Sequence, residues 1–186
     1  MSVLELRTTD PEGTRLAAQV IAGALRPGDL LVLDGPLGAG KTTFTQGLGA
    51  GLDVRGPVAS PTFVIARVHP SLSGGPALVH VDAYRLGDGW DLEDLDLDSD
   101  IDASVMVVEW GRGRVEHMVS SHLLVELERP AQVADPDDPD EPRTVRLTTA
   151  GPRWDRPALE ALTTALGDAG LRIQERIEES SIEEES

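Results

Sequence analysis

Residues 30–48, LLVLDGPLGAGKTTFTQGL, contain the pattern that decides the fold of this 186-residue chain. The apolar run Leu30–Asp34 predicts a buried strand, and the segment from Lys41 to Leu48 has a composition compatible with a helix. Between them lies a glycine-rich bend that fits the pattern G-x-x-x-x-G-K-[ST]. That pattern requires a strand before it and a helix after it, so the sequence predicts a phosphate-binding loop in the context it needs.

The lysine of this pattern stands out against the composition of the chain. The chain has 16 basic residues, and all except Lys41 are arginines, a bias most simply explained by genome-wide amino-acid usage. A compact, flexible ammonium can reach between the β- and γ-phosphates of a nucleotide, whereas the planar guanidinium of arginine is bulkier. The position of the single lysine therefore indicates phosphate binding.

The loop itself supplies most of the expected nucleotide contacts. We expect the backbone N–H groups of residues 37–42 to face the phosphates, together with the positive end of the following helix. The Thr42 hydroxyl is expected to bind Mg²⁺, which would bridge the phosphates and draw off charge during transfer. Thr43 either contacts the nucleotide or packs locally. The predicted nucleotide-binding residues of the loop are Gly35, Leu37, Gly38, Ala39, Gly40, Lys41, Thr42 and Thr43.

Two carboxylates follow predicted strands and are candidates for the metal site. The run LVHVD, within the predicted strand Ala77–Leu86, ends at Asp82, and the run VMVVE, within the predicted strand Ser104–Trp110, ends at Glu109. In a parallel sheet both would emerge at the carboxyl edge beside the loop. We assign Glu109 to magnesium and Asp82 to metal support or activation of the attacking water, and the reverse order stays open.

Other residues near these motifs have either a structural or a functional interpretation. In SPTF, residues 60–63, either Pro61 directs a local turn or Thr62 acts as a switch residue near the γ-phosphate. His80 and Tyr84 flank Asp82 and are expected mainly to pack. A simple packing role is also open for Trp110, and Arg85 and Arg143 either pair with surface acids or stabilise transferred charge.

The remaining pattern predicts one α/β domain: a three-layer P-loop NTPase fold with a mostly parallel central sheet and antiparallel additions. We expect this domain over residues 1–167 and a flexible, acidic C-terminal tail over 168–186. Leu16, Val20, Ala24 and Leu25 are expected on one stripe of the first helix. The other predicted elements are a short edge strand at 3–8, helices at 14–25 and 156–166, and strands at 62–69, 122–129 and 144–149, with a hairpin turn at 70–76.

Charge and composition exclude several classes of function. The net charge of −17 disfavours a broad nucleic-acid surface, so no stable direct nucleic-acid binding is expected. The chain contains no cysteine, which excludes disulfides and thiolate metal sites. It has no apolar run long enough for a membrane span and no secretory signal pattern at its start, so we expect no membrane association and a cytoplasmic location.

Four landmarks together resemble the bacterial TsaE family, also called YjeE. They are GPLGAGKTTF, SPTF, HVDAYRL and VVEWG, in this order and spacing, and the resemblance covers roughly residues 10 to 150. It implies a small, magnesium-dependent P-loop ATPase, slow on its own, that works with TsaD and TsaB in the threonylcarbamoyl modification of adenosine 37 in tRNA. It implies that Lys41, Asp82 and Thr62 are catalytic and that Trp110 joins Thr42, Thr43 and Glu109 in the ATP and Mg²⁺ site. Pro36 departs from the family, which usually has aspartate there.

Three other functions share parts of this pattern. A small-molecule or nucleoside kinase would have the same loop and acids, but it usually has an arginine-rich lid, and the sequence has no compact arginine cluster after the central strands. A GTPase is disfavoured because its N-K-x-D element needs a second lysine. A nucleotide-switched binding module, in which turnover is incidental, overlaps with the family role.

We predict that Lys41→Ala abolishes ATP hydrolysis, because it removes the one ammonium of the loop while leaving the helix intact. Phosphate release by the purified variant measures this. Turnover close to that of the unmodified protein would remove Lys41 from the mechanism.

Overall fold

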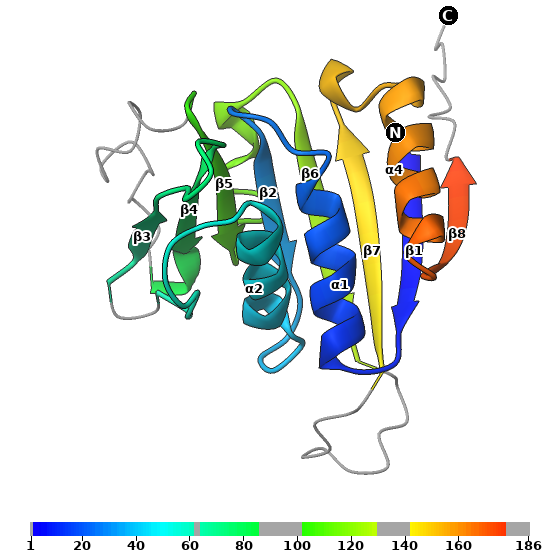
Figure 1. Ribbon diagram of the computed structural model, residues 1–186, viewed down its shortest axis with the longest axis horizontal. Coiled ribbons are helices and arrows are strands. Elements are labelled where there is room, and N and C mark those ends of the chain that lie inside the picture. The colour runs from blue at the N-terminus through cyan, green and yellow to red at the C-terminus, as the bar shows by residue number, and fades with distance from the viewer. Residues whose placement is uncertain (1, 62–63, 86–101, 130–141, 178–186) are drawn as a thin grey trace, which may run out of the picture.

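The computed structural model describes residues 2–61, 64–85, 102–129 and 142–177, and these residues form one eight-stranded sheet flanked by helices (Figure 1). The strand order is β3-β4-β5-β2-β6-β7-β1-β8. In chain order the strands are β1 (Ser2–Thr8), β2 (Leu30–Asp34), β3 (Ala66–His69), β4 (Ala77–Asp82), β5 (Ser104–Glu109), β6 (His122–Glu128), β7 (Arg143–Ala150) and β8 (Arg172–Ile177).

The centre of the sheet is parallel and its flanks are antiparallel. β4, β5, β2 and β6 run in one direction, whereas β3 on one side and β7, β1 and β8 on the other pair antiparallel. β4, β5 and β2 are almost continuously apolar and buried, as parallel strands covered on both faces must be. β6 and β7 instead alternate between buried and more exposed residues. The expected α/β fold with a parallel centre and antiparallel additions is confirmed.

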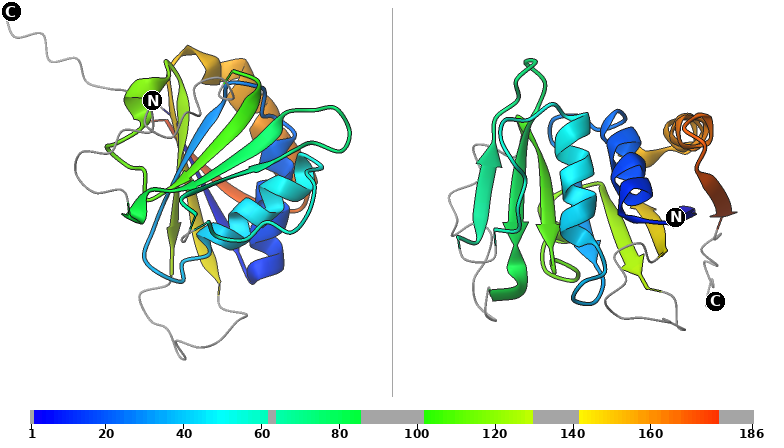
Figure 2. Two further views of the ribbon diagram at one scale, coloured as in Figure 1. Left: turned by 90° about the vertical axis from the view of Figure 1, so that its left-hand side faces the viewer. Right: turned by 60° about the horizontal axis from the view of Figure 1, so that its bottom comes forward.

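Three helices pack on one face of this sheet (Figure 2). They are α1 (Pro11–Ala22), α2 (Lys41–Gly51) and α4 (Arg156–Asp168), and their buried side chains join those of β2, β5, β6 and β7 in one core. A second core on the opposite face combines Val32, Val81 and Val108 with Val115, beside the short 3₁₀ helix η3 (Glu116–Met118). In the described part of the chain this segment forms the third layer. Among the same residues, no helix is long and apolar enough to cross a membrane.

α1 packs closely against α2 through small residues. The buried face of α1 includes Ala18 and Ala22, and on α2 a Cβ at Gly47 would lie 2.8 Å from the Cβ of Ala18. Of the predicted stripe, Leu25 is buried in the core and Val20 and Ala24 pack against it, whereas Leu16 was placed wrongly. Leu16 is exposed because close helix contact needs the alanine face. The helix also begins earlier than predicted, because the Asp10 side chain caps it and Pro11 occupies the first turn.

The first and last strands along the chain, β1 and β8, are neighbours in the sheet. β1 was predicted to be an edge strand, but it pairs with β7 on one side and β8 on the other. β8 comprises Arg172–Ile177, which fall within the expected tail at 168–186. Their charged sequence RIQERI lacks the apolar run that the prediction needed, so the strand was missed. The last part of that expected tail, residues 178–186, lies outside the described residues.

The bounds of β3, β4 and β5 differ from the predicted strand ranges. The hairpin of β3 and β4 is confirmed, but β3 begins at Ala66 and Ile65 has a positive φ of 68°. β4 ends at Asp82 and is followed by η1 (Ala83–Arg85), and β5 ends at Glu109. The expected ends of LVHVD at Asp82 and of VMVVE at Glu109 are confirmed, and only the wider strand ranges Ala77–Leu86 and Ser104–Trp110 ran past these carboxylates.

We predict that Gly47→Ala destabilises the protein by about 2 kcal/mol, because the added Cβ would collide with the α1 backbone at Arg15 and with Ala18. Replacing glycine by alanine inside a helix usually stabilises the helix, so the predicted destabilisation has the opposite sign. Gly167→Ala in α4 is the matched control: nothing lies near its added Cβ, so it should stabilise by about 0.5–1 kcal/mol. Urea unfolding of both variants tests this, and a stabilised Gly47→Ala would contradict the packing.

Candidate functional site

The carboxyl ends of β2, β4 and β5 and the start of α2 surround one cleft. Its volume is about 590 Å³. The sheet register places Asp82 at the end of β4 directly beside Glu109 at the end of β5, as expected for neighbouring parallel strands. The lining residues are Leu37, Gly38, Gly40, Lys41, Thr42, Thr43, Ser60, Asp82, Tyr84, Glu109 and Trp110.

The loop between β2 and α2 depends on glycine. Gly35, Gly38 and Gly40 all have positive φ, at 142°, 76° and 103°. A side chain at Gly35 would also overlap the carbonyl oxygen of Leu127 in β6. Only glycine can adopt this φ and also fit against the Leu127 carbonyl oxygen at position 35, so the glycines of the sequence determine the shape of the loop.

The first turn of α2 differs from those of α1 and α4. Asp10 and Asp155 cap those two helices by accepting hydrogen bonds from the backbone N–H groups of Gly13 and Ala158. The corresponding residue of α2 is Gly40, and no side chain caps the helix there. The N–H groups at this helix start are therefore available to an anion, which the helix dipole also favours.

Lys41 is 6% exposed, and its side chain folds back onto the loop that precedes it. Its Nζ donates hydrogen bonds to the carbonyl oxygens of Gly35, at 2.6 Å, and Pro36, at 3.0 Å. Burial lowers the pKa of the ammonium, while the carboxylates of Glu109, Asp34 and Asp82 oppose that shift. A phosphate oxygen offers this cation a stronger partner than either neutral carbonyl does.

Trp110 covers Lys41 from the other side. The Lys41 Nζ lies 3.8 Å from the centroid of the Trp110 ring, a distance typical of a cation–π contact. Trp110 has a φ of 61°, which is strained for a non-glycine residue. Its backbone N–H still donates a hydrogen bond to the carbonyl oxygen of Leu33 in β2. Its ring centroid lies 5.4 Å from that of Tyr84. The turn after β5 therefore aims the indole into the cleft.

Glu109 is 3% exposed and has two contacts in the site. Its Oε1 lies 2.9 Å from Nε2 of His80 and 3.4 Å from the Thr42 hydroxyl. Asp82 is also buried, and its Oδ1 accepts a hydrogen bond from the backbone N–H of Tyr84. Carboxylate and hydroxyl oxygens are ligands that Mg²⁺ prefers, so the donor set fits this ion together with nucleotide phosphates.

Asp34, at the end of β2, holds the start of the loop in place, a role that was not predicted from its position at the end of a strand. Its Oδ1 accepts a hydrogen bond from the Gly35 N–H, and its Oδ2 pairs with Arg112 at 3.0 Å. Arg112 also pairs with Glu126 of β6 at 2.6 Å. These contacts fasten the start of the loop to two neighbouring segments of the sheet edge.

The structure brings most of the predicted site residues into this cleft. Gly35 and Ala39 belong to the loop but not to the lining, and Thr62 lies outside the described residues. Arg143 begins β7, and its Nη1 donates to Pro142 O; it is not among the cleft residues. The side chain of Arg85 is not described.

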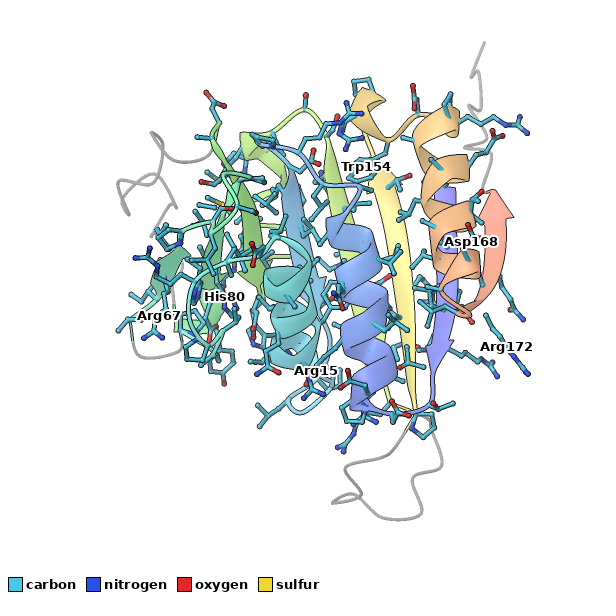
Figure 3. All side chains as sticks on the ribbon, in the orientation of Figure 1. Arg15, Arg67, His80, Trp154, Asp168 and Arg172 are labelled. Atoms are coloured by element: carbon cyan, nitrogen blue, oxygen red, sulfur yellow. The ribbon has the colours of Figure 1, made fainter. Side chains whose placement is uncertain are left out.

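Three residues of the site were not singled out as functional from the sequence. Ser60 and Tyr84 line the cleft, and His80, which is labelled in Figure 3, contacts Glu109. His80 and Tyr84 had been assigned mainly to packing. The available signal was the spacing His80, Asp82 along one strand, which places both side chains on the same face.

Comparisons with known proteins give consistent matches over this region. The family model described as "Threonylcarbamoyl adenosine biosynthesis protein TsaE" matches residues 8–135. The Streptomyces coelicolor "tRNA threonylcarbamoyladenosine biosynthesis protein TsaE" is 58% identical over 135 residues, covering 72% of this chain and 88% of that protein. The Mycobacterium tuberculosis protein of the same name is 50% identical over 124 residues, covering 63% and 71%. The crystal structure of Bacillus subtilis YdiB superposes with a TM-score of 0.66 at 30% identity, covering 88% of this chain and 97% of that one.

We predict that nucleotide binding changes the fluorescence of Trp110, because Lys41 should leave the indole face when it turns to phosphate. Trp110→Phe should abolish the change. Trp154→Phe is the matched control and should retain it: Trp154 also has a cation, Arg153, over its ring, but it lies at the opposite end of the sheet (Figure 3). A nucleotide-dependent signal that persists in Trp110→Phe would contradict this arrangement.

Proposed function

Because this chain belongs to the TsaE family, we propose that it is a magnesium-dependent ATPase that supports the threonylcarbamoyl modification of adenosine 37 in tRNA. The observation that carries the proposal is the single cleft that joins an uncapped helix start, a buried lysine and two adjacent carboxylates. TsaD and TsaB are the proposed partners, and this chain hydrolyses ATP without itself transferring the carbamoyl group.

The loop would hold the phosphates in a defined orientation. Backbone N–H groups of residues 37–42 would donate to phosphate oxygens, that of Ala39 after leaving Pro36 O, and Lys41 would exchange its contacts with Gly35 O and Pro36 O for the β- and γ-phosphates. The exchange is favourable because a charged acceptor replaces two neutral ones. It also keeps the ammonium within the loop that already positions it.

The carboxylates divide the remaining work between them. Asp82 and Glu109 would repel a nucleotide unless a cation accompanied it, and Mg²⁺ would supply the positive charge that offsets the charge of the phosphates. Thr42 and Glu109 are the residues we assign to hold the ion, since they already approach each other. Asp82 then orients the attacking water and accepts its proton, with metal support as its other role. Thr62 stays a proposed catalytic switch residue.

The rim of the cleft supports a role with partner proteins. Leu37 is 89% exposed at the tip of the loop and Tyr84 is 68% exposed beside Trp110. Apolar side chains that stand in solvent at the mouth of a nucleotide site gain free energy when another surface covers them. We therefore propose that TsaD and TsaB accelerate turnover by closing over this rim.

We predict that the purified protein hydrolyses ATP slowly alone and at least several-fold faster with TsaD and TsaB from the same organism. Phosphate release measures the rate, and Lys41→Ala at the same partner concentration is the control, because residual partner-dependent release would come from another protein. Transfer of phosphate from ATP to a metabolite would instead identify a kinase. Equal rates with and without partners would overturn the accessory role.

A further inference from the structure

His80 lies beneath the proposed metal site and has no part in the function described so far. It belongs to β4, two residues before Asp82, and the register places it opposite Val107, two residues before Glu109. The side chains of His80 and Glu109 therefore point to the α2 side of the sheet, where His80 is fully buried. Its Nε2 lies 2.9 Å from Oε1 of Glu109.

The hydrogen-bonding partners of His80 define its proton arrangement. An ionised carboxylate can only accept, so Nε2 must carry the hydrogen that Glu109 Oε1 receives. Nδ1 is buried and has no hydrogen-bond partner among the described residues. The neutral ring with its hydrogen on Nε2 satisfies the carboxylate without burying a second N–H group that has no acceptor.

This contact restricts the orientation of Glu109. Without it, the carboxylate at the end of β5 could turn toward the nearby Lys41 ammonium, which already interacts with it electrostatically. With it, Oε1 is held between His80 and the Thr42 hydroxyl. The other oxygen, Oε2, makes no hydrogen bond with the described residues and is available to a cation or to its water shell.

We infer that His80 is a positioning residue that holds Glu109 in the orientation needed for Mg²⁺ bound with nucleotide. This inference rests on the proposed function, since it assumes that a magnesium–nucleotide complex enters the cleft. Residues that orient a metal-binding side chain commonly contribute about 10- to 100-fold to metal affinity. His80 should therefore affect binding through magnesium and not through the nucleotide alone.

The test is calorimetric titration with the non-hydrolysable ATP analogue AMP-PNP, in EDTA and over a series of Mg²⁺ concentrations. His80→Phe keeps a buried ring but removes the donor, and it should weaken the magnesium-dependent affinity about 10-fold or more while affinity in EDTA stays unchanged. His80→Gln can extend an amide N–H toward Glu109 and should restore most of the loss. If His80→Phe does not fold, His80→Asn, one methylene too short to reach, replaces it.

A double-variant comparison separates positioning from a general structural effect. In a Glu109→Ala background, His80→Phe should cause no further loss of magnesium-dependent affinity, because the group it positions is absent. Equal losses in EDTA and in magnesium, additive losses in the double variant, or magnesium dependence equal to that of the unmodified protein would each overturn the inference. Failure of the proposed function has a different signature: the unmodified protein itself would show no magnesium-dependent binding.

Discussion

The backbone N–H groups at the start of α2 form the proposed anion site, and the other features of the cleft depend on it. They are available because Gly40 supplies no capping side chain and adopts a φ of 103°, whereas α1 and α4 begin with capping aspartates. Holding these groups in place requires a rigid surrounding. β2 is hydrogen-bonded between β5 and β6, and Gly47 lets α1 close tightly against α2. The anion site is thus a product of the fold as well as of the loop.

The charges around this proposed anion site would suit a metal-bound nucleotide. One ammonium, that of Lys41, interacts with the carboxylates of Asp34, Asp82 and Glu109. Asp34 is paired with Arg112, and the buried carboxylates of Asp82 and Glu109 lie beside the proposed position of the phosphates. A polyanion alone would meet repulsion there, and a magnesium–nucleotide complex would not. This balance explains why lysine, carboxylates and helix start belong to one site.

The local parts of this arrangement could be predicted from the sequence, and the long-range parts could not. Gly35, Lys41 and Thr42 act through a continuous segment, and Asp82 and Glu109 meet because parallel strands end at a common edge. The place of β1 depended on a partner, β8, whose charged sequence carried no strand signal. The buried face of α1 depended on how closely α2 approaches, which made alanine suitable and left Leu16 outside. The proposed role of His80 depended on where the Glu109 side chain lies on the neighbouring strand.

The most direct test is a crystal structure of the protein with Mg²⁺ and a non-hydrolysable ATP analogue. The account predicts phosphates held by the N–H groups of residues 37–42, Lys41 Nζ moved from the Gly35 and Pro36 carbonyls onto the β- and γ-phosphates, and the ion beside Thr42 and Glu109. A nucleotide bound elsewhere, or a loop that remains closed on Lys41 at saturating ligand, would contradict it.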